Sequence, residues 1–217
     1  MERRKLLITG CGRSGTMYAS EVWKTQGLDI THENPLPPNG SMGKDGIASW
    51  YMAVNDPDPP FGPSACNYQF DFVIHQVRDP LKVIASVAQF ILRDRLSRDY
   101  IERNATATRL THAELSLPRR DRLLLQAARY WYYWNLIGEQ RASLTVQVEQ
   151  LTASLVRLCE FLGVTYRPDV AELVSKNIHG RCLYTDEAYW EIEWNDIARI
   201  DAEVCKKIKQ LARKYGY

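Results

Sequence analysis

The fold of this 217-residue chain is decided by the stretch KLLITGCGRSGT, Lys5–Thr16. An apolar run, predicted as a strand over Lys5–Thr9, is followed by three glycines and then by a segment with helical spacing, Thr16–Gln26. A strand that passes through a glycine-rich turn into a helix points backbone N–H groups and the positive end of the helix at an anion. The stretch therefore predicts an α/β fold with an oxyanion site after its first strand.

A second segment of the same kind follows another apolar run, Phe72–Val77. It reads Arg78-Asp79-Pro80 and continues to Ser86. Proline suits the first turn of a helix, so Arg78 stands at a strand end and Ser86 lies about two helical turns further on. A guanidinium and a hydroxyl in these places can face one dianion. Together the two segments predict a ligand with phosphates at two separate places.

The rest of the chain alternates strands and helices. Further strands are predicted at Leu28–Thr31 and Leu144–Val148, and further helices at Asp45–Val54, Leu81–Leu92, Arg119–Arg141, Leu151–Leu162, Pro168–Lys176 and Asn195–Tyr215. Such alternation predicts a central parallel sheet flanked by helices. No Gly/Ser/Pro-rich linker divides the chain, so we expect one domain over residues 1–217.

Composition excludes several classes of protein. A formal net charge of +2 gives no general affinity for nucleic acid or for an anionic membrane. The apolar run behind the basic N-terminus is too short for a signal peptide or a membrane anchor. Five cysteines without a close CxxC pair argue against a disulfide framework and a zinc site. We expect a cytoplasmic protein with no integral membrane segment and no metal.

The glycine-rich turn differs from the loop of ATPases. Gly10 and Gly15 have the Walker A spacing, but Thr16 stands where that motif has its lysine. That lysine reaches the β- and γ-phosphates, so its loss argues against ordinary ATP hydrolysis. A cation lies inside the turn instead, at Arg13, where a guanidinium can clamp a phosphate with two hydrogen bonds.

Both segments resemble the sulfotransferases that use 3′-phosphoadenosine 5′-phosphosulfate (PAPS), which have a P-loop-like fold. Arg13-Ser14-Gly15-Thr16 is similar to the 5′-phosphosulfate loop of that family, closest to its bacterial and tyrosylprotein-type members, and Arg78, Pro80 and Ser86 match its 3′-phosphate segment. The resemblance implies PAPS as co-substrate and 3′-phosphoadenosine 5′-phosphate (PAP) as product. It implies that these are bound by Gly12, Arg13, Ser14, Gly15, Thr16, Arg78 and Ser86, with Arg181 as a further phosphate ligand.

The same resemblance indicates a general base. Glu33 follows Arg13 by the interval at which the catalytic glutamate follows the loop arginine in the tyrosylprotein branch. His32 is the second candidate, because cytosolic members use a histidine. Arg13 would stabilise the leaving phosphate. The acceptor would be a hydroxyl or an amine of a small molecule or a carbohydrate. The structural alternatives are a loop cap for Glu33 and an orienting hydrogen bond for His32.

Two other functions stay open from the residues. One is a P-loop-type nucleotide or small-molecule kinase, and the other is a nucleotide-binding module without catalysis. The mixed-charge stretch Arg93–Arg122 is predicted to be a solvated face, with a lid over the acceptor as the alternative. His75 is expected to be packed and hydrogen bonded, and Trp131, Tyr133 and Trp134 are expected in the core. The sequence defines neither the acceptor nor the oligomeric state.

Overall fold

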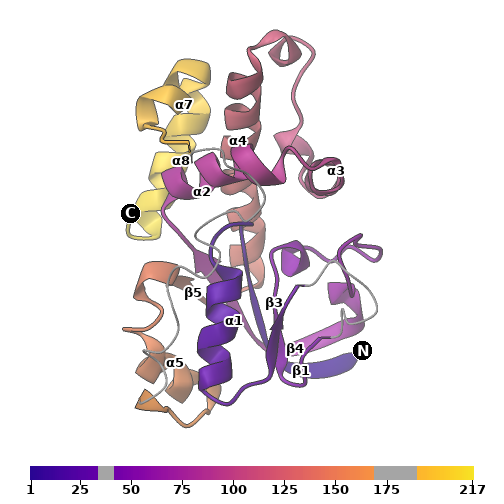
Figure 1. Ribbon diagram of the computed structural model, residues 1–217, viewed down its shortest axis with the longest axis vertical. Helices are drawn as coiled ribbons and strands as arrows, with labels where there is room; N and C mark the ends of the chain where they lie inside the picture. Colours follow the sequence, from indigo (N-terminus) through magenta and orange to yellow (C-terminus); the bar gives the residue numbers. More distant parts are fainter. Residues whose placement is uncertain (34–41, 169–189) are drawn as a thin grey trace.

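The centre of the protein is a parallel sheet, seen in a computed structural model that describes residues 1–33, 42–168 and 190–217. In this part of the chain the sheet has five strands in the order β2-β3-β1-β4-β5 (Figure 1). Their bounds are Glu2–Gly10 (β1), Ile30–His32 (β2), Gly46–Ala48 (β3), Tyr68–Val77 (β4) and Leu144–Gln147 (β5). The parallel sheet confirms the predicted fold class.

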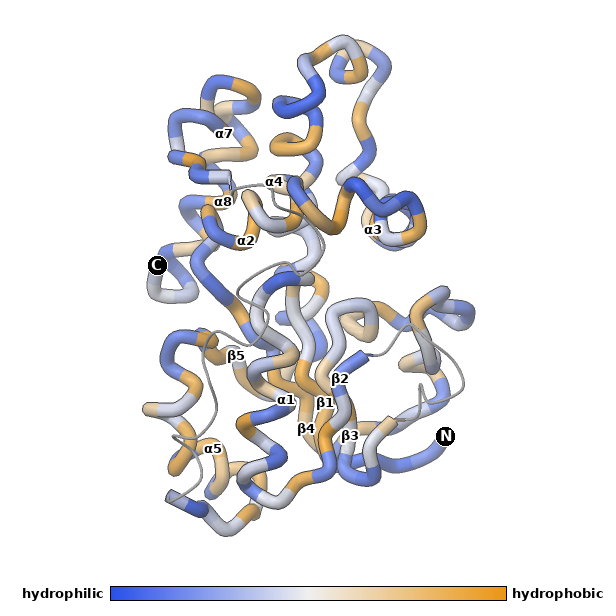
Figure 2. The backbone as a smooth tube through the Cα atoms, viewed as in Figure 1, coloured by the Kyte–Doolittle hydropathy of each residue, from blue (hydrophilic) through white to orange (hydrophobic). Residues whose placement is uncertain are grey.

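Helices cover both faces of the sheet, because β1 is apolar on both sides. Leu6 and Ile8 pack with α1 (Thr16–Thr25) and α5 (Leu155–Leu162) on one face. Leu7 packs with α4 (Arg119–Arg141) on the other, and α8 (Ala202–Lys214) packs against α4. Figure 2 shows this apolar centre in orange along the strands. The central strand is therefore fully buried at the point where it enters the glycine-rich turn.

The helix predicted over Asp45–Val54 is wrong, because β3 lies there. Gly46 passes so close to β1 that a Cβ on it would overlap the Leu6 carbonyl oxygen. Ile47 and Ala48 are buried and continue the register with β1 and β2. A three-residue strand carries too little periodicity to be recognised from sequence. Its presence places the next residues, Ser49 and Trp50, beside the end of β2.

Two other predicted helices have different boundaries. The C-terminal helix is two helices, α7 (Trp194–Ile200) and α8, because Asp201 leaves the helical conformation and accepts a hydrogen bond from the Val204 N–H at 2.9 Å. The helix after Pro80 is α2 (Pro80–Ser86), which continues as a π-helical turn, η3 (Val87–Ile91). The helix predicted over Pro168–Lys176 lies, apart from its first residue, outside the described residues.

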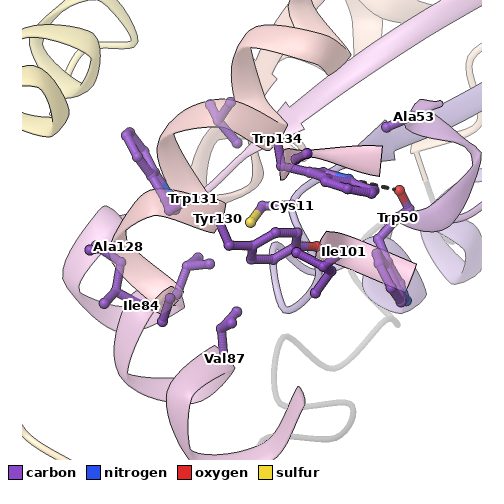
Figure 3. Close-up of a cluster of buried hydrophobic side chains, with 14 of the residues drawn as sticks. Cys11, Trp50, Ala53, Ile84, Val87, Ile101, Ala128, Tyr130, Trp131 and Trp134 are labelled. Atoms are coloured by element: carbon purple, nitrogen blue, oxygen red, sulfur yellow. Dashed lines mark hydrogen bonds between the residues drawn. The ribbon is translucent and has the colours of Figure 1, made fainter. Parts of the chain in front are cut away.

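An aromatic cluster joins α4 to the glycine-rich turn (Figure 3). The Trp134 indole N–H donates to the Trp50 carbonyl at 3.0 Å, and the Tyr130 and Trp134 rings are 5.1 Å apart. The Gly12 N–H donates to the Tyr130 hydroxyl oxygen at 2.8 Å. Trp131 and Trp134 are fully buried, as predicted, whereas Tyr133 is only partly buried. The core therefore fixes the backbone of the turn directly.

His75 is held in β4 as a neutral ring. It is buried, with Nε2 at 3.0 Å from Asn135 Oδ1 and Nδ1 at 3.2 Å from Thr145 Oγ1. The Asn135 amide donates to the Trp131 carbonyl, so its oxygen is free to accept from Nε2–H. Burial lowers the pKa of His75 from 6.5 to about 4. A packed, uncharged histidine is what the sequence predicts here.

We expect the contribution of His75 to the free energy of unfolding to fall as the pH drops from 6.5 to about 4. In this window the unfolded chain binds a proton at residue 75 that the native chain does not bind, so this group favours unfolding in acid by up to ~3 kcal/mol. Urea unfolding of the wild type and of His75→Gln at stepped pH measures this contribution as the difference between their free energies of unfolding. That difference should change with pH, whereas the difference between the wild type and His112→Gln, at an exposed position, should not. A constant difference for His75→Gln would assign the acid sensitivity to other groups.

Candidate active site

The carboxyl ends of the first four strands open onto one cavity. Its volume is about 300 Å³, and its lining includes Arg13, Gly15, Thr16, His32, Glu33 and Arg78. These residues end or follow β1, β2 and β4, and parallel strands bring their carboxyl ends to the same edge. The structure thus brings together six of the residues predicted for the site.

Arg13 has an unusual backbone conformation. Its φ is +71°, in the left-handed region, which costs a residue with a Cβ about 1–2 kcal/mol. Its Nε donates to Ser86 Oγ at 2.8 Å, and its guanidinium lies over the Phe90 ring, 5.5 Å from the centroid. The two contacts hold the guanidinium against α2 and η3, and Arg13 lines the cavity there. Strain kept at one residue of a turn points to a functional demand there.

The amides of the turn have different partners. The Gly12 N–H is committed to Tyr130, and the Ser14 N–H donates to the Cys11 carbonyl at 3.1 Å. Gly12 also has no room for a side chain, because a Cβ there would collide with Ile91. Gly15, at φ +90°, ends the turn, and the first N–H groups of α1 have no partner within the helix. The start of α1 is therefore the part of the turn best placed for an anion.

The side chain of Ser14 points into the protein. It is 1% exposed, and its hydroxyl has no hydrogen-bond partner among the described residues. Its carbonyl accepts from the Gln76 amide at 2.8 Å. Ser14 was predicted to bind phosphate through its N–H group, but that group donates to the Cys11 carbonyl, and the side chain lies under the turn, outside the cavity lining.

Arg78 and Ser86 adjoin the same turn. Arg78 Nη1 donates to the Arg13 carbonyl at 3.2 Å, and the Ser86 hydroxyl accepts from the Arg13 guanidinium. Ser86 is 7% exposed. The two predicted anion-binding segments therefore meet at one place. Arg181, the further ligand predicted, lies outside the described residues.

Glu33 lies at the end of β2 with its carboxyl group buried. Its Oε2 accepts from the Ser49 hydroxyl at 2.7 Å and from the Trp50 N–H at 3.1 Å. Its Oε1 is 3.6 Å from His32 Nε2, which in turn lies 3.1 Å from Thr16 Oγ1. Burial raises the pKa of Glu33 from 4.5 to about 8. One carboxyl oxygen is thus held by β3 and the following turn, while the other lies beside His32.

Sequence reasoning missed two residues that shape this site, Ser49 and Gln76, and it offered Trp50 only as an aromatic for the nucleotide or the acceptor. The contacts of Ser49 and Trp50 with Glu33 depend on β3, which was not recognised. Gln76 carried a signal, since a buried amide near the end of an apolar strand needs a partner. It finds that partner in the turn, at the Ser14 carbonyl.

Within the described segments, no group of three or more His, Cys, Asp and Glu side chains is arranged to hold a metal ion. None of the helices in these segments combines the length and the hydropathy that crossing a membrane requires.

Comparisons with known proteins found a similar solved structure and no similar sequence. No protein-family model matches the chain, and no curated protein matches its sequence. Among solved structures, the chain is similar to the mouse sulfotransferase SULT7A1 complexed with PAP, with a TM-score of 0.47 and 13% identity. That match covers 97% of this chain and 89% of the mouse chain. We therefore argue the function from the geometry of the site.

Proposed function

We propose that the chain is a sulfotransferase, which moves a sulfuryl group from PAPS to a hydroxyl or amine of a small-molecule or carbohydrate acceptor in the cytoplasm. We take residues 1–217 as one domain with this activity. The observation that supports it best is that one cavity holds two guanidiniums, the start of a helix and a carboxyl group with a raised pKa. Sulfuryl transfer needs cations on the leaving phosphate and a base for the acceptor proton.

The two arginines can bind phosphate without breaking the contacts that hold them. Arg13 uses only Nε on Ser86, so its two terminal nitrogens remain for the 5′-phosphosulfate, next to the start of α1. Arg78 uses Nη1 on the Arg13 carbonyl. Its other nitrogens, with the Ser86 hydroxyl, would bind the 3′-phosphate. A guanidinium has five N–H donors, so a structural bond and a ligand bond are compatible.

Glu33 would act as the general base. The acceptor hydroxyl would lose its proton to the Glu33 carboxylate while its oxygen bonds to sulfur. The bond between sulfur and the 5′-phosphate oxygen would break at the same time, and Arg13 would stabilise the charge that develops there. The hydrogen bonds from Ser49 and Trp50 fix the carboxyl group for this step. Its pKa of about 8 makes the ionised form a strong base for a carboxylate.

One observation favours a second candidate, a nucleotide-binding module without catalysis. The Glu33 carboxyl group accepts a hydrogen bond from the N–H of Trp50, the residue that precedes the short 3-10 helix Tyr51–Ala53. A carboxyl group in that place has a structural use without any reaction. Nucleotide binding would then remain, and sulfuryl transfer would be absent.

Thermal unfolding with added nucleotides tests the proposal. We expect PAP to raise the melting temperature, with ~2.7 kcal/mol of stabilisation at a hundredfold excess over Kd. Adenosine 5′-monophosphate should stabilise less, because it lacks the 3′-phosphate for Arg78. ATP with magnesium should have little effect. Stabilisation by ATP with magnesium but not by PAP would support the kinase instead and overturn the proposal.

Transfer from radiolabelled PAPS to a panel of phenols, sugars and amines separates the two remaining candidates. Labelled product supports the sulfotransferase. Stabilisation by PAP without transfer to any acceptor supports the binding module.

A further inference from the structure

A second cavity lies among the helices, away from the sheet-edge cavity. Its volume is about 490 Å³, and it is bounded by α3 (Arg95–Asn104), the segment that follows α3, and the first turns of α4. The two cavities share no lining residue, although Ile91 lines the first and Leu92 lines the second. Five arginines line the second cavity: Arg93, Arg98, Arg109, Arg119 and Arg122.

Within the described segments, the charges of Arg98, Arg109, Arg119 and Arg122 are poorly neutralised. Among the residues of this part of the chain that line the cavity, the only carboxylate is Glu102, which accepts a hydrogen bond from the Gln126 amide. Arg109 donates to the Glu102 main-chain carbonyl at 3.2 Å, and Arg122 donates to the Leu115 carbonyl at 2.9 Å. Bonds to main-chain oxygens orient a guanidinium without cancelling its charge.

Arg129, further along α4, shows the contrast. It forms two hydrogen bonds with the Glu114 carboxylate, at 2.6 and 3.0 Å, and lies 3.5 Å from Asp201. This pairing lowers the pKa of Glu114 to about 2. The charge of Arg129 is therefore neutralised by carboxylates. Within the described segments, no carboxylate lies within 4 Å of the guanidinium of Arg98, Arg109, Arg119 or Arg122.

The cavity also has an apolar part. Four leucines line it, and Leu115 is 50% exposed while Leu92 is fully buried. Figure 2 shows hydrophilic and hydrophobic residues interspersed along α3 and the segment leading to α4. The stretch predicted as a solvated face is largely exposed, and some of its arginines and leucines line this cavity side by side. Its volume is within the range for small-ligand sites.

We propose that this cavity binds an anionic amphiphile, a small molecule with a carboxylate, phosphate or sulfate group on an aliphatic or aromatic body. The anion would pair with the guanidiniums, and the body would cover the leucines. Nucleic acid fits less well, because the charges surround a cavity with leucine walls and the chain as a whole carries only +2. The inference is independent of the proposed sulfotransferase activity.

Calorimetry on the full chain without nucleotide tests the ligand class. The probe is dodecanoate below its micellar concentration, compared with neutral dodecyl maltoside and with inorganic sulfate. We expect dodecanoate to bind at least about tenfold more tightly than either. Dodecyl maltoside lacks the anionic group that would pair with the arginines, and sulfate lacks the apolar chain that would cover the leucines. Equal binding of dodecyl maltoside would overturn the anionic part, and equal binding of sulfate would overturn the apolar part.

Paired variants locate the site. Arg98→Gln and Arg119→Gln should each weaken dodecanoate binding about tenfold, whereas Arg95→Gln, on α3 outside the lining, should not. Leu115→Ser should also weaken it, while Leu96→Ser, at the similar exposure of 51%, should not. Arg119 is at the N-terminus of α4, where a cation is unfavourable, so its removal should not unfold the protein.

Equal losses in the Arg95 and Leu96 controls would mean that the ligand binds elsewhere, and would overturn the site. Stabilisation by PAP should be unchanged in all these variants, so a failure of this inference is distinguishable from a failure of the sulfotransferase assignment.

Discussion

Replacing Glu33 by glutamine is expected to slow sulfuryl transfer by about 10²- to 10⁴-fold, the usual contribution of a general base. Glutamine keeps an oxygen that can accept from Ser49 and Trp50, so the loop should stay in place. PAP binding should change little. Single-turnover transfer from labelled PAPS measures the effect, and Glu21→Gln, on α1 outside the cavity lining, is the matched control.

The pH profile separates catalysis by Glu33 from a structural role. A base with a pKa of about 8 gives a kcat/KM that rises with pH up to that value and then levels off. This limb should vanish in Glu33→Gln and persist in His32→Gln. If instead His32→Gln removes the limb and Glu33→Gln retains full activity, then His32 is the base.

Stability gives an independent check on the same variant. The pKa of Glu33 is higher in the folded chain than its ordinary value of 4.5. Between pH 4.5 and 8 the native chain therefore binds more protons at this group than the unfolded chain, so stability is lost as the pH rises. Glu33→Gln should remove this loss and raise the melting temperature at pH 8. A lower melting temperature there would show that an ionised Glu33 stabilises the fold.

The sequence predicts the elements of this fold better than their assembly. The long helix was predicted at Arg119–Arg141, as observed, because its apolar and aromatic spacing extends over many turns. Gly163, in the left-handed conformation, ends α5 where a glycine C-cap was expected. β3 was missed because three residues show no period, and the break at Asp201 was missed because an N-cap within a continuous amphipathic pattern leaves that pattern unchanged.

For the candidate site, too, the sequence predicts single residues better than the contacts between them. Arg13, Arg78 and Glu33 were found because each follows a predicted strand, and strand ends meet at one edge of a parallel sheet. The contacts of Ser49 and Trp50 with Glu33 were not predicted, because they depend on the order of the strands. The arginines between residues 93 and 122 have no sequence signal for a cavity, because it forms only when α3 packs near the start of α4. Motifs identify chemical groups, whereas tertiary contacts decide which groups face one another.

Replacing Arg13 by glycine is expected to weaken PAP binding about a hundredfold, since a bidentate charged contact is worth about 3 kcal/mol. The ligand-free protein should keep its stability. Glycine adopts φ +71° without penalty, and this offsets the lost contacts with Ser86 and Phe90. Titration calorimetry with PAP and thermal unfolding without ligand measure the two effects on one variant.

Arg13→Lys shows which property of the arginine matters. It keeps the charge and the backbone strain but loses the planar fork, so PAP affinity should lie between those of the wild type and the glycine variant. Arg3→Gln, at an exposed position in β1, is the control for loss of a positive charge outside the cavity. Wild-type affinity in Arg13→Gly would mean that the turn does not hold the nucleotide. A collapse of ligand-free stability in both Arg13→Gly and Arg13→Lys would instead assign the guanidinium to the fold, because both variants lose its contacts with Ser86 and Phe90.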